Sequence, residues 1–229
     1  MKILSILTLA LSAGSLCAQE PAFHLDARVQ VFGEMTRPEP FRAAQVGGYD
    51  IRDQGLRQTG FGVRFLGELV SAPHFYYEVG GKLESSSRLT FNGPIPGGGS
   101  LNLTDIKFSN SYWSLGMAYL ATFGDNVALG LHLEGRGEAL KAKGEVVVNG
   151  VHGGQFVDAS ATYLRPWVRI SLDYTFALGK VRPYLGAEGA YTPMKTKQTG
   201  ILDLDRMDDR TLKSMAPNSS AAVYLGMRF

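Results

Sequence analysis

The last nine residues of the chain, 221–229, alternate between apolar and other side chains with a period of two. One face of this strand is apolar along its whole length, and the strand ends on an aromatic residue. A soluble protein seldom leaves such an edge strand bare, because its unpaired N–H and C=O groups invite aggregation. A closed barrel in a membrane has no edge, and its outer face must be apolar. The pattern therefore favours a membrane-spanning barrel, with its outer face at this strand formed by Ala221, Val223, Leu225, Met227 and Phe229.

The first 18 residues have the layout of a cleaved secretory signal. A positive start is followed by a mostly apolar run at 3–11 and by small residues that lead to Ala18. We expect cleavage after Ala18, which leaves 19–229 as one barrel domain. The apolar run is shorter than the roughly 20 residues of a membrane-spanning helix. Cys17 raises the alternative of a lipoprotein signal, but Leu16 stands where that signal has a small residue.

Composition excludes several classes of protein. The chain has 23 Lys and Arg against 21 Asp and Glu, a net charge of +2, and loss of the signal removes one lysine and no acid, which leaves +1. There is no basic excess for nucleic acid and no acidic tail. The single cysteine lies in the expected signal, so no disulfide is expected. Mean hydropathy is near neutral, as it is when every apolar residue of a spanning strand has polar neighbours.

Period-2 alternation marks eight strands. Their expected ranges are 23–36, 60–70, 75–84, 112–123, 127–140, 162–176, 181–192 and 221–229. Three connections are tight turns, at 71–74, 124–126 and 177–180, and four are long, at 37–59, 85–111, 141–161 and 193–219. Short and long connections in strict alternation, with an even number of strands, are typical of an outer-membrane barrel. A soluble eight-stranded barrel would not require this alternation.

We therefore predict an all-β protein, an antiparallel up-and-down transmembrane β-barrel of eight strands. Short turns and both termini would be periplasmic, and the long loops extracellular. Two loops, 88–106 and 144–157, could be hairpins that extend above the membrane. The second turns near Asn149-Gly150 and could instead add a strand pair to the barrel, which would give ten strands.

Aromatic residues gather at the predicted rims of the barrel, where amphipathic rings favour the headgroup level. The simpler alternative is that strands favour aromatic residues everywhere. Because these residues group at strand ends, we expect two aromatic girdles. The periplasmic girdle would comprise Phe23, Phe75, Phe123, Tyr174, Phe176 and Phe229, and the other Phe61, Trp113 and Tyr191.

The strand pattern covers nearly the whole chain after the signal, and 181–191 read Val-Arg-Pro-Tyr-Leu-Gly-Ala-Glu-Gly-Ala-Tyr. Together with the last strand, this resembles the small eight-stranded outer-membrane β-barrel family, which includes the transmembrane domain of outer membrane protein A and porin-like barrels. Pro-Tyr-hydrophobic-Gly recurs in the penultimate strand of that family. Its members include structural anchors, narrow pores, adhesins and a few lipid-modifying enzymes, so the resemblance indicates architecture better than activity.

The resemblance also implies partners. In this family a terminal Phe closing an alternating strand acts as a C-terminal insertion signal. It implies the barrel assembly machinery as a partner, with outer-membrane lipids and lipopolysaccharide around the barrel. The residues that the resemblance assigns to this assembly signal are Val223, Leu225, Met227 and Phe229.

The inward faces of the predicted strands carry charges of both signs. An eight-stranded barrel has an interior just wide enough to be filled by side chains, and buried charges have to be paired. We expect an ion-pair network that plugs the lumen; the alternative is a narrow, gated conduit in which pairs exchange partners. The network is expected to comprise Arg28, Arg64, Glu68, Glu78, Lys82, Glu134, Arg136, Arg169, Asp173, Glu188 and Arg228, with Glu34, Glu138, Arg165 and Arg182 facing the same way.

One pair follows from the tight turn at 177–180. If two or four residues form this loop, the numbers of opposed residues add up to 357. Arg169 then lies opposite Glu188 in the lumen, and Leu172 lies opposite Leu185 on the outer face. Opposite charges directly across a ladder are favourable.

Candidate metal sites are weak. His132 and Glu134 lie two residues apart on one strand face, but no third ligand is identifiable, so both are expected to belong to the plug. The last long loop could bind calcium or bridge lipopolysaccharide through divalent ions. It lacks the glycine and distal glutamate of an EF-hand and has basic neighbours, so a solvated loop is favoured. Its acidic residues are Asp203, Asp205, Asp208 and Asp209.

No convincing catalytic set is present. A lipid-modifying barrel enzyme would need a histidine with a serine and a carboxylate at the extracellular rim, and only His152 falls in an outer loop. We expect no catalytic residue, no cofactor and no metal. The sequence thus predicts a non-enzymatic outer-membrane barrel with a structural or narrow porin-like role. A surface adhesin acting through its long loops is the alternative, and a lipid-modifying enzyme comes third. A small solute or surface ligand remains open, whereas nucleic acid is excluded.

Overall fold

The structure is a computed structural model. The expected signal, Phe23 and the aspartates between 203 and 209 lie outside the residues that it describes. No helix in the described part of the chain is long and apolar enough to cross a membrane. The described residues are 26–36, 44–46, 49–51, 57–94, 100–148, 151–178, 182–194 and 216–229.

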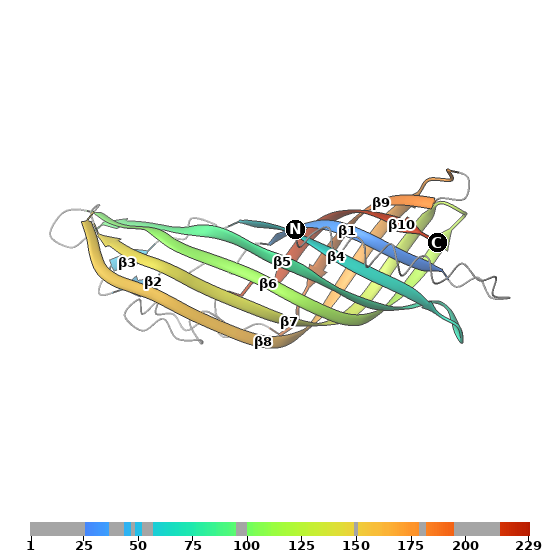
Figure 1. The fold of residues 1–229 in the computed structure, drawn as a ribbon, viewed down its shortest axis with the longest axis horizontal. Helices are drawn as coiled ribbons and strands as arrows, with labels where there is room; N and C mark the ends of the chain where they lie inside the picture. Colours follow the sequence, from blue (N-terminus) through green and yellow to red (C-terminus); the bar gives the residue numbers. More distant parts are fainter. Residues whose placement is uncertain are drawn as a thin grey trace, which may run out of the picture.

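Eight antiparallel strands form a closed barrel, which confirms the predicted fold class (Figure 1). Each strand pairs with its neighbour in the chain, and β1 closes the barrel against β10. A two-stranded sheet that the alternation did not reveal lies in the first long connection, formed by β2 (Ala44–Val46) and β3 (Tyr49–Ile51). The barrel strands are β1 (Ala27–Thr36), β4 (Gln58–Leu69), β5 (Ala72–Pro94), β6 (Ser100–Phe123), β7 (Val127–Val148), β8 (Val151–Thr175), β9 (Arg182–Tyr191) and β10 (Ser219–Arg228).

The strands differ in length by a factor of two. β5 to β8 have 22–25 residues, whereas β1, β4, β9 and β10 have 10–12. Figure 1 shows the four long strands continuing together beyond the barrel. We call the end toward which they project the hairpin end, and the opposite end, with the short connections, the turn end.

The long strands correct the choice between eight and ten strands. β7 and β8 remain paired with each other up to Val148 opposite Val151, and β5 and β6 remain paired up to Pro94 opposite Ser100. The extra residues therefore lengthen two hairpins and add no strand to the barrel wall. The ten-stranded alternative is wrong, and the hairpin interpretation is confirmed.

The ladder between β8 and β9 ends at Val168 opposite Tyr191. Continued by two residues, the same register would place Pro166 opposite Pro193, and proline has no N–H to donate. The side chain of Thr192 instead donates a hydrogen bond of 2.7 Å to the carbonyl of Pro166. Two prolines thus explain why the ladder between β8 and β9 stops at this level.

The alternation puts apolar residues outside and polar residues inside. Along β7, Leu129, Leu131 and Leu133 are exposed, whereas His132 and Glu134 are buried. Exposed aromatic residues mark both ends of this apolar band. Of the predicted girdle residues, Phe75, Phe123, Tyr174, Phe176 and Phe229 are exposed at the turn end, and Phe61, Trp113 and Tyr191 toward the hairpin end; Tyr77 and Tyr119 are exposed as well.

The predicted register between β8 and β9 is wrong by two residues. Leu172 lies opposite Ala187, and Arg169 lies opposite Ala190. The midpoint between opposed residues lies one residue further along the chain than the turn at 177–180 suggested. The sequence shows a short turn but not where it is centred. Because a shift of two keeps every side chain on its face, Arg169 and Glu188 both still point into the lumen.

Candidate functional site

The lumen collects the buried charges of the barrel. Seven acidic and six basic residues of the described chain are buried, and Arg228 adds a seventh cation with 24% of its side chain exposed. Half-buried Glu68 adds an eighth acid, so the two signs nearly balance without any charge on His132. The buried acidic residues are Asp26, Glu34, Glu78, Glu134, Glu138, Asp173 and Glu188, and the buried basic ones are Arg28, Arg64, Lys82, Arg136, Arg165 and Arg169.

Two arginines and two glutamates form the middle of the lumen. Arg64 donates two hydrogen bonds to Glu188, of 3.0 and 3.1 Å, and its Nε lies 2.9 Å from Glu78 Oε1. Arg169 pairs with the other oxygen of Glu78, and its Nε lies 3.3 Å from Glu188 Oε2. The four residues come from β4, β5, β8 and β9, so the cluster ties together walls that are not neighbours. Paired forks of this kind are the strong geometry for buried arginine.

His132 joins this cluster from β7. Its Nδ1 lies 2.8 Å from Glu78 Oε2, and its Nε2 lies 2.8 Å from Ser171 Oγ. Arg169 Nη2 also lies 2.7 Å from the same Nδ1. A ring nitrogen either donates or accepts, so His132 cannot satisfy Glu78 and Arg169 at the same atom.

Toward the hairpin end, the next layer surrounds Glu34. Lys82 Nζ lies 3.2 Å from Glu34 Oε1, and Arg136 Nη1 lies 3.4 Å from its Oε2. The Tyr112 hydroxyl donates to the same oxygen at 2.8 Å. The Arg136 guanidinium lies between two rings, 4.3 Å from that of Tyr112 and 4.2 Å from that of Trp167. Cation–π contact stabilises a guanidinium that has left water.

Arg165 and Glu138 form the outermost buried pair of the lumen. Arg165 donates through Nε and Nη2 to the two oxygens of Glu138, at 3.1 and 2.8 Å. It also donates to the Asn218 side chain and to the carbonyl of Pro217. The indole of Trp167 donates to Glu138 at 2.7 Å. This pair anchors the start of β10 to the long strands.

The turn end is closed by Asp26 and its partners. Arg28 and Arg228 both reach Asp26, at 3.2 and 2.9 Å, and the Tyr76 hydroxyl donates to it at 2.6 Å. Arg28 Nη1 also lies 3.5 Å from Asp173. Polar side chains from β1, β5, β8 and β10 thus meet at this end.

Nearly all residues predicted to fill the lumen come together there, with two differences. Glu68 is half-buried and makes no ion pair within the described part of the chain; it accepts hydrogen bonds from the backbone of Asp26 and His74. Arg182 is exposed at the turn end. Both lie where the lumen opens, because the alternation gives the face of a side chain but not its depth.

Sequence reasoning missed the aromatic partners of these charges. Tyr76, Tyr112, Tyr184, Trp167 and Tyr224 are buried and contact charged side chains. Their inward position follows from the same alternation, but only charged residues were assigned to the network. Tyrosine and tryptophan suit such a lumen because a large ring fills space while its O–H or N–H group bonds a buried charge.

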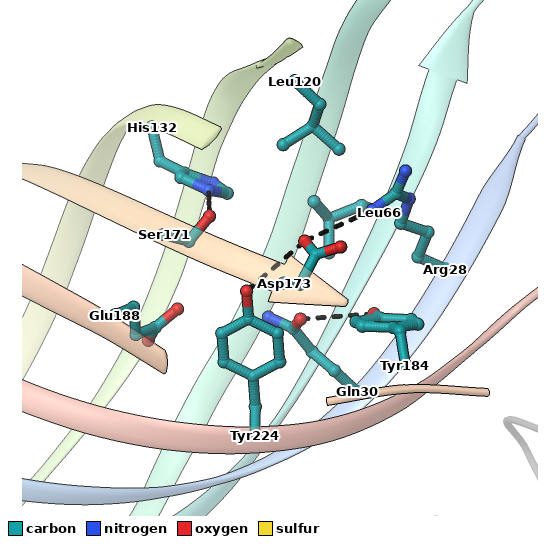
Figure 2. A pocket seen from close by; sticks show the side chains of 10 residues that line it. All are labelled: Arg28, Gln30, Leu66, Leu120, His132, Ser171, Asp173, Tyr184, Glu188 and Tyr224. Carbon is teal, nitrogen blue, oxygen red and sulfur yellow. Dashed lines mark hydrogen bonds and ion pairs between the residues drawn. The ribbon is translucent and has the colours of Figure 1, made fainter. Parts of the chain in front are cut away.

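The lumen contains a small cavity, and Figure 2 shows the side chains that line it. Its volume of about 10 Å³ is room for about one water molecule. Asp173 Oδ1 faces no hydrogen-bond partner among the described groups, and the Tyr224 hydroxyl points at the other oxygen of Asp173 at 3.4 Å. The cavity is closed to anything of the size of a hydrated ion.

Ser171, His132 and Glu78 have the hydrogen-bond order of a hydrolase triad, but they lack what catalysis needs. Ser171 is buried, and the neighbouring cavity has no room for a substrate. Arg169 also competes for both Glu78 and the ring, whereas the acid of a triad holds the histidine alone.

The other histidine whose side chain is described, His74, is exposed and contacts Tyr119. Within the described residues, no three His, Cys, Asp or Glu side chains could hold a metal ion.

The observed contacts give Glu188 two arginine partners, Arg64 and Arg169. Replacing Glu188 with alanine should lower the free energy of unfolding by about 3 kcal/mol, because it leaves buried arginine unpaired. In double-mutant cycles, the coupling energy with Arg64 should exceed that with Arg169, since Arg64 makes two shorter contacts. A larger coupling with Arg169 would contradict this geometry.

No protein-family model and no curated protein matches the chain. Solved structures of similar shape exist at low identity. The attachment invasion locus protein Ail of Yersinia pestis, in complex with the heparin analogue sucrose octasulfate, has 10% identity and a TM-score of 0.49 over 90% of this chain and 100% of that one. Neisserial surface protein A has 9% identity and a TM-score of 0.46, over 91% and 98% of the two chains. The outer membrane protein OprG from Pseudomonas aeruginosa has 9% identity and a TM-score of 0.42, over 89% and 95%.

At these values the likeness is one of shape, and the assignment of the fold rests on the strand pairing itself. The closed eight-stranded antiparallel barrel is established by its ladders. What the barrel does has to be argued from its two surfaces.

Proposed function

We propose that the chain is an outer-membrane β-barrel protein with a lumen that is closed at rest, and that its role is structural, without enzymatic activity. The observation that carries the proposal is that the barrel is apolar outside and charged inside. Twenty-eight large apolar side chains are exposed in the described part of the chain. Soluble monomers rarely expose contiguous apolar surface on this scale, whereas a barrel in lipid requires it.

The packing of the lumen favours a plug rather than an open pore. Its buried charges form ion pairs, and its cavity has room for about one water molecule. An ion would have to displace several pairs to pass. We therefore expect the resting barrel to conduct little.

Electrophoresis and conductance test this proposal. An unboiled sample should migrate differently from a boiled one on SDS gels, and the refolded protein should show rare, small openings in a planar bilayer. Equal migration, or recovery of the protein in the soluble periplasmic fraction, would count against a membrane barrel. A steady large conductance would be consistent with a membrane barrel but would contradict the closed lumen.

The remaining assignments complete the proposal. Residues 1–18 act as a cleaved signal, both termini lie in the periplasm, and the barrel assembly machinery reads the last strand. Lipopolysaccharide and other outer-membrane lipids surround the apolar band. The polar outward side chains beyond Trp113, among them Lys141, Lys143 and Asp158, would then stand outside the cell.

Cysteine labelling tests this orientation. Cysteine at Lys143 or Asp158 should react with a membrane-impermeant reagent on intact cells, because both side chains are exposed on the hairpins. Cysteine at Ala72, the first residue of β5, or at Asp125, in the turn between β6 and β7, should react only after the outer membrane is breached. The reverse pattern would overturn the orientation.

A second candidate function is recognition at the cell surface. The four long strands project two hairpins beyond the barrel, which is more structure than a plug needs. Shortening the hairpins at 88–106 and 144–157 should then abolish binding to a host surface and leave the barrel folded. Binding that survives this change would exclude the hairpins as the recognition element.

A further inference from the structure

His132 stands where three polar groups compete for two ring nitrogens. Nδ1 lies within hydrogen-bond distance of both Glu78 and Arg169, at 2.8 and 2.7 Å, and Nε2 faces Ser171 at 2.8 Å. A guanidinium can only donate and an ionised carboxylate can only accept. A neutral ring can therefore accept from Arg169 at Nδ1 in one tautomer and donate to Glu78 in the other.

Protonation removes this choice. Both ring nitrogens then carry hydrogen, so Nδ1 can only donate to Glu78, and Arg169 faces a second cation in direct contact. The described charges of the lumen nearly balance when His132 is neutral, and a proton on the ring adds a positive charge beside Arg169. A cation–cation contact at this depth is costly because the surroundings screen it poorly.

The groups around His132 come from most of the barrel wall. β6 presents the neutral Ala118 opposite it, and β10 presents Tyr224 across the cavity. The charged groups that face this part of the lumen are Arg28 of β1, Arg64 of β4, Glu78 of β5, Glu134 on its own strand, Arg169 and Asp173 of β8, and Glu188 of β9.

Arg169 has other acceptors within reach. Glu188 Oε2 lies 3.3 Å from its Nε, and Glu134 Oε2 lies 3.7 Å from its Nη1. The small cavity is lined by His132, Ser171 and Glu188, so the ring that would release Arg169 and one carboxylate that would receive it border free space. The same residues thus offer a second arrangement in which Arg169 has left the ring.

We propose that His132 is a protonation-controlled latch of the lumen. In its neutral form His132 accepts from Arg169 at Nδ1 while Glu78 pairs with the same guanidinium, and the plug is closed. In its protonated form it releases Arg169 toward Glu134 and Glu188, and the plug loosens. The proposal deepens the closed-lumen barrel proposed above and rests on it.

Histidine is the side chain that fits such a role, since it ordinarily titrates between about pH 5 and pH 8. Of the histidines whose side chains the structure describes, His132 is buried in the lumen and His74 is exposed at the turn end. His74 therefore provides a matched control on the same barrel.

Single-channel recording of the refolded, full-length mature protein tests the latch. The wild type should show about a tenfold larger open population at about pH 5 than at about pH 8, which corresponds to about 1.4 kcal/mol. This is the low end of what a hydrogen bond to a charged group contributes. His74→Gln should keep this response, and His132→Gln should lose it, because glutamine stays neutral. A response that survives His132→Gln, or is lost in His74→Gln, overturns the proposal.

Side-chain nitrogen NMR on the same protein gives a second measurement that needs no openings. The His132 ring signals should titrate, and the Arg169 guanidinium signals should move with them. Arg169 signals that stay fixed while His132 titrates would overturn the latch even if the channel never opens. Loss of heat-modifiable migration at both pH values would instead refute the barrel proposal, so the two failures are distinguishable.

Discussion

Replacing Glu78 with glutamine should lower the free energy of unfolding by about 3–5 kcal/mol, the cost of breaking a buried ion pair from one side. Glu78 is 1% exposed and is shared by Arg64, Arg169 and His132. Its loss leaves both guanidiniums sharing Glu188, with only the longer contact of 3.7 Å to Glu134 left to Arg169. The effect would be measured as a fall in the denaturant midpoint, or in the temperature at which the folded gel band disappears.

Glu84 provides a matched control on the same strand. Its side chain is 49% exposed, and its pair with Lys141 has a separation of 3.8 Å. An exposed pair of this kind contributes at most about 1 kcal/mol, so Glu84→Gln should hardly change the midpoint. Equal effects of the two substitutions would mean that burial of the pair does not determine its strength in this lumen.

Replacing Phe229 with serine should sharply reduce the amount of folded protein in the outer membrane of cells, while purified protein still refolds. The proposed reason is that the last residue is read during assembly. Its backbone also closes the barrel, with its N–H donating to the carbonyl of Ala27 at 2.9 Å, and serine keeps this hydrogen bond. The measurement is the quantity of heat-modifiable protein in the membrane fraction.

Phe123→Ser is the control for this experiment. Phe123 lies at the same rim and has the same exposed fraction as Phe229, 60%. Both substitutions therefore remove a similar apolar contact with lipid, and their difference isolates recognition of the last strand. If Phe123→Ser reduces assembly as much, the aromatic rim accounts for the effect and the assembly signal at Phe229 is refuted.

Strand number and faces could be predicted because both depend on a local signal. Alternation with a period of two shows which side chains of β7 face outward, and the structure exposes Leu129, Leu131 and Leu133 as expected. Short and long connections likewise show how the strands are joined. The hairpin at 144–157 could be anticipated from its turn signal at Asn149-Gly150, but only pairing through Val148 and Val151 decides against ten strands.

Partners inside the lumen could not be predicted, because they depend on geometry across the barrel. Arg64 of β4 meets Glu188 of β9, two strands that share no ladder. Which residues come to the same depth depends on the stagger of all eight strands. The predicted pair of Arg169 and Glu188 exists as a contact of 3.3 Å, although the register from which it was inferred is wrong.

Depth also explains why Glu68 was misjudged and why the hydrogen-bond partners of the lumenal tyrosines could not be named. Two residues on the same face can lie in the middle of the lumen or at its mouth, and alternation treats them alike. Glu68 lies where backbone N–H groups of Asp26 and His74 can reach it. Tyr112 lies deep enough that its hydroxyl has to bond Glu34.

The charges of the lumen have a consequence for how the chain acquires its structure. Arg64 and Glu188 are 124 residues apart in the sequence, Arg136 and Glu34 are 102 apart, and Arg169 and Glu78 are 91 apart. A partial barrel would hold unmatched charges against lipid, so fragments gain little until nearly every strand is present. High contact order of this kind slows folding. The chain should therefore fold late and all at once, and split halves of the barrel should fold only when they are mixed.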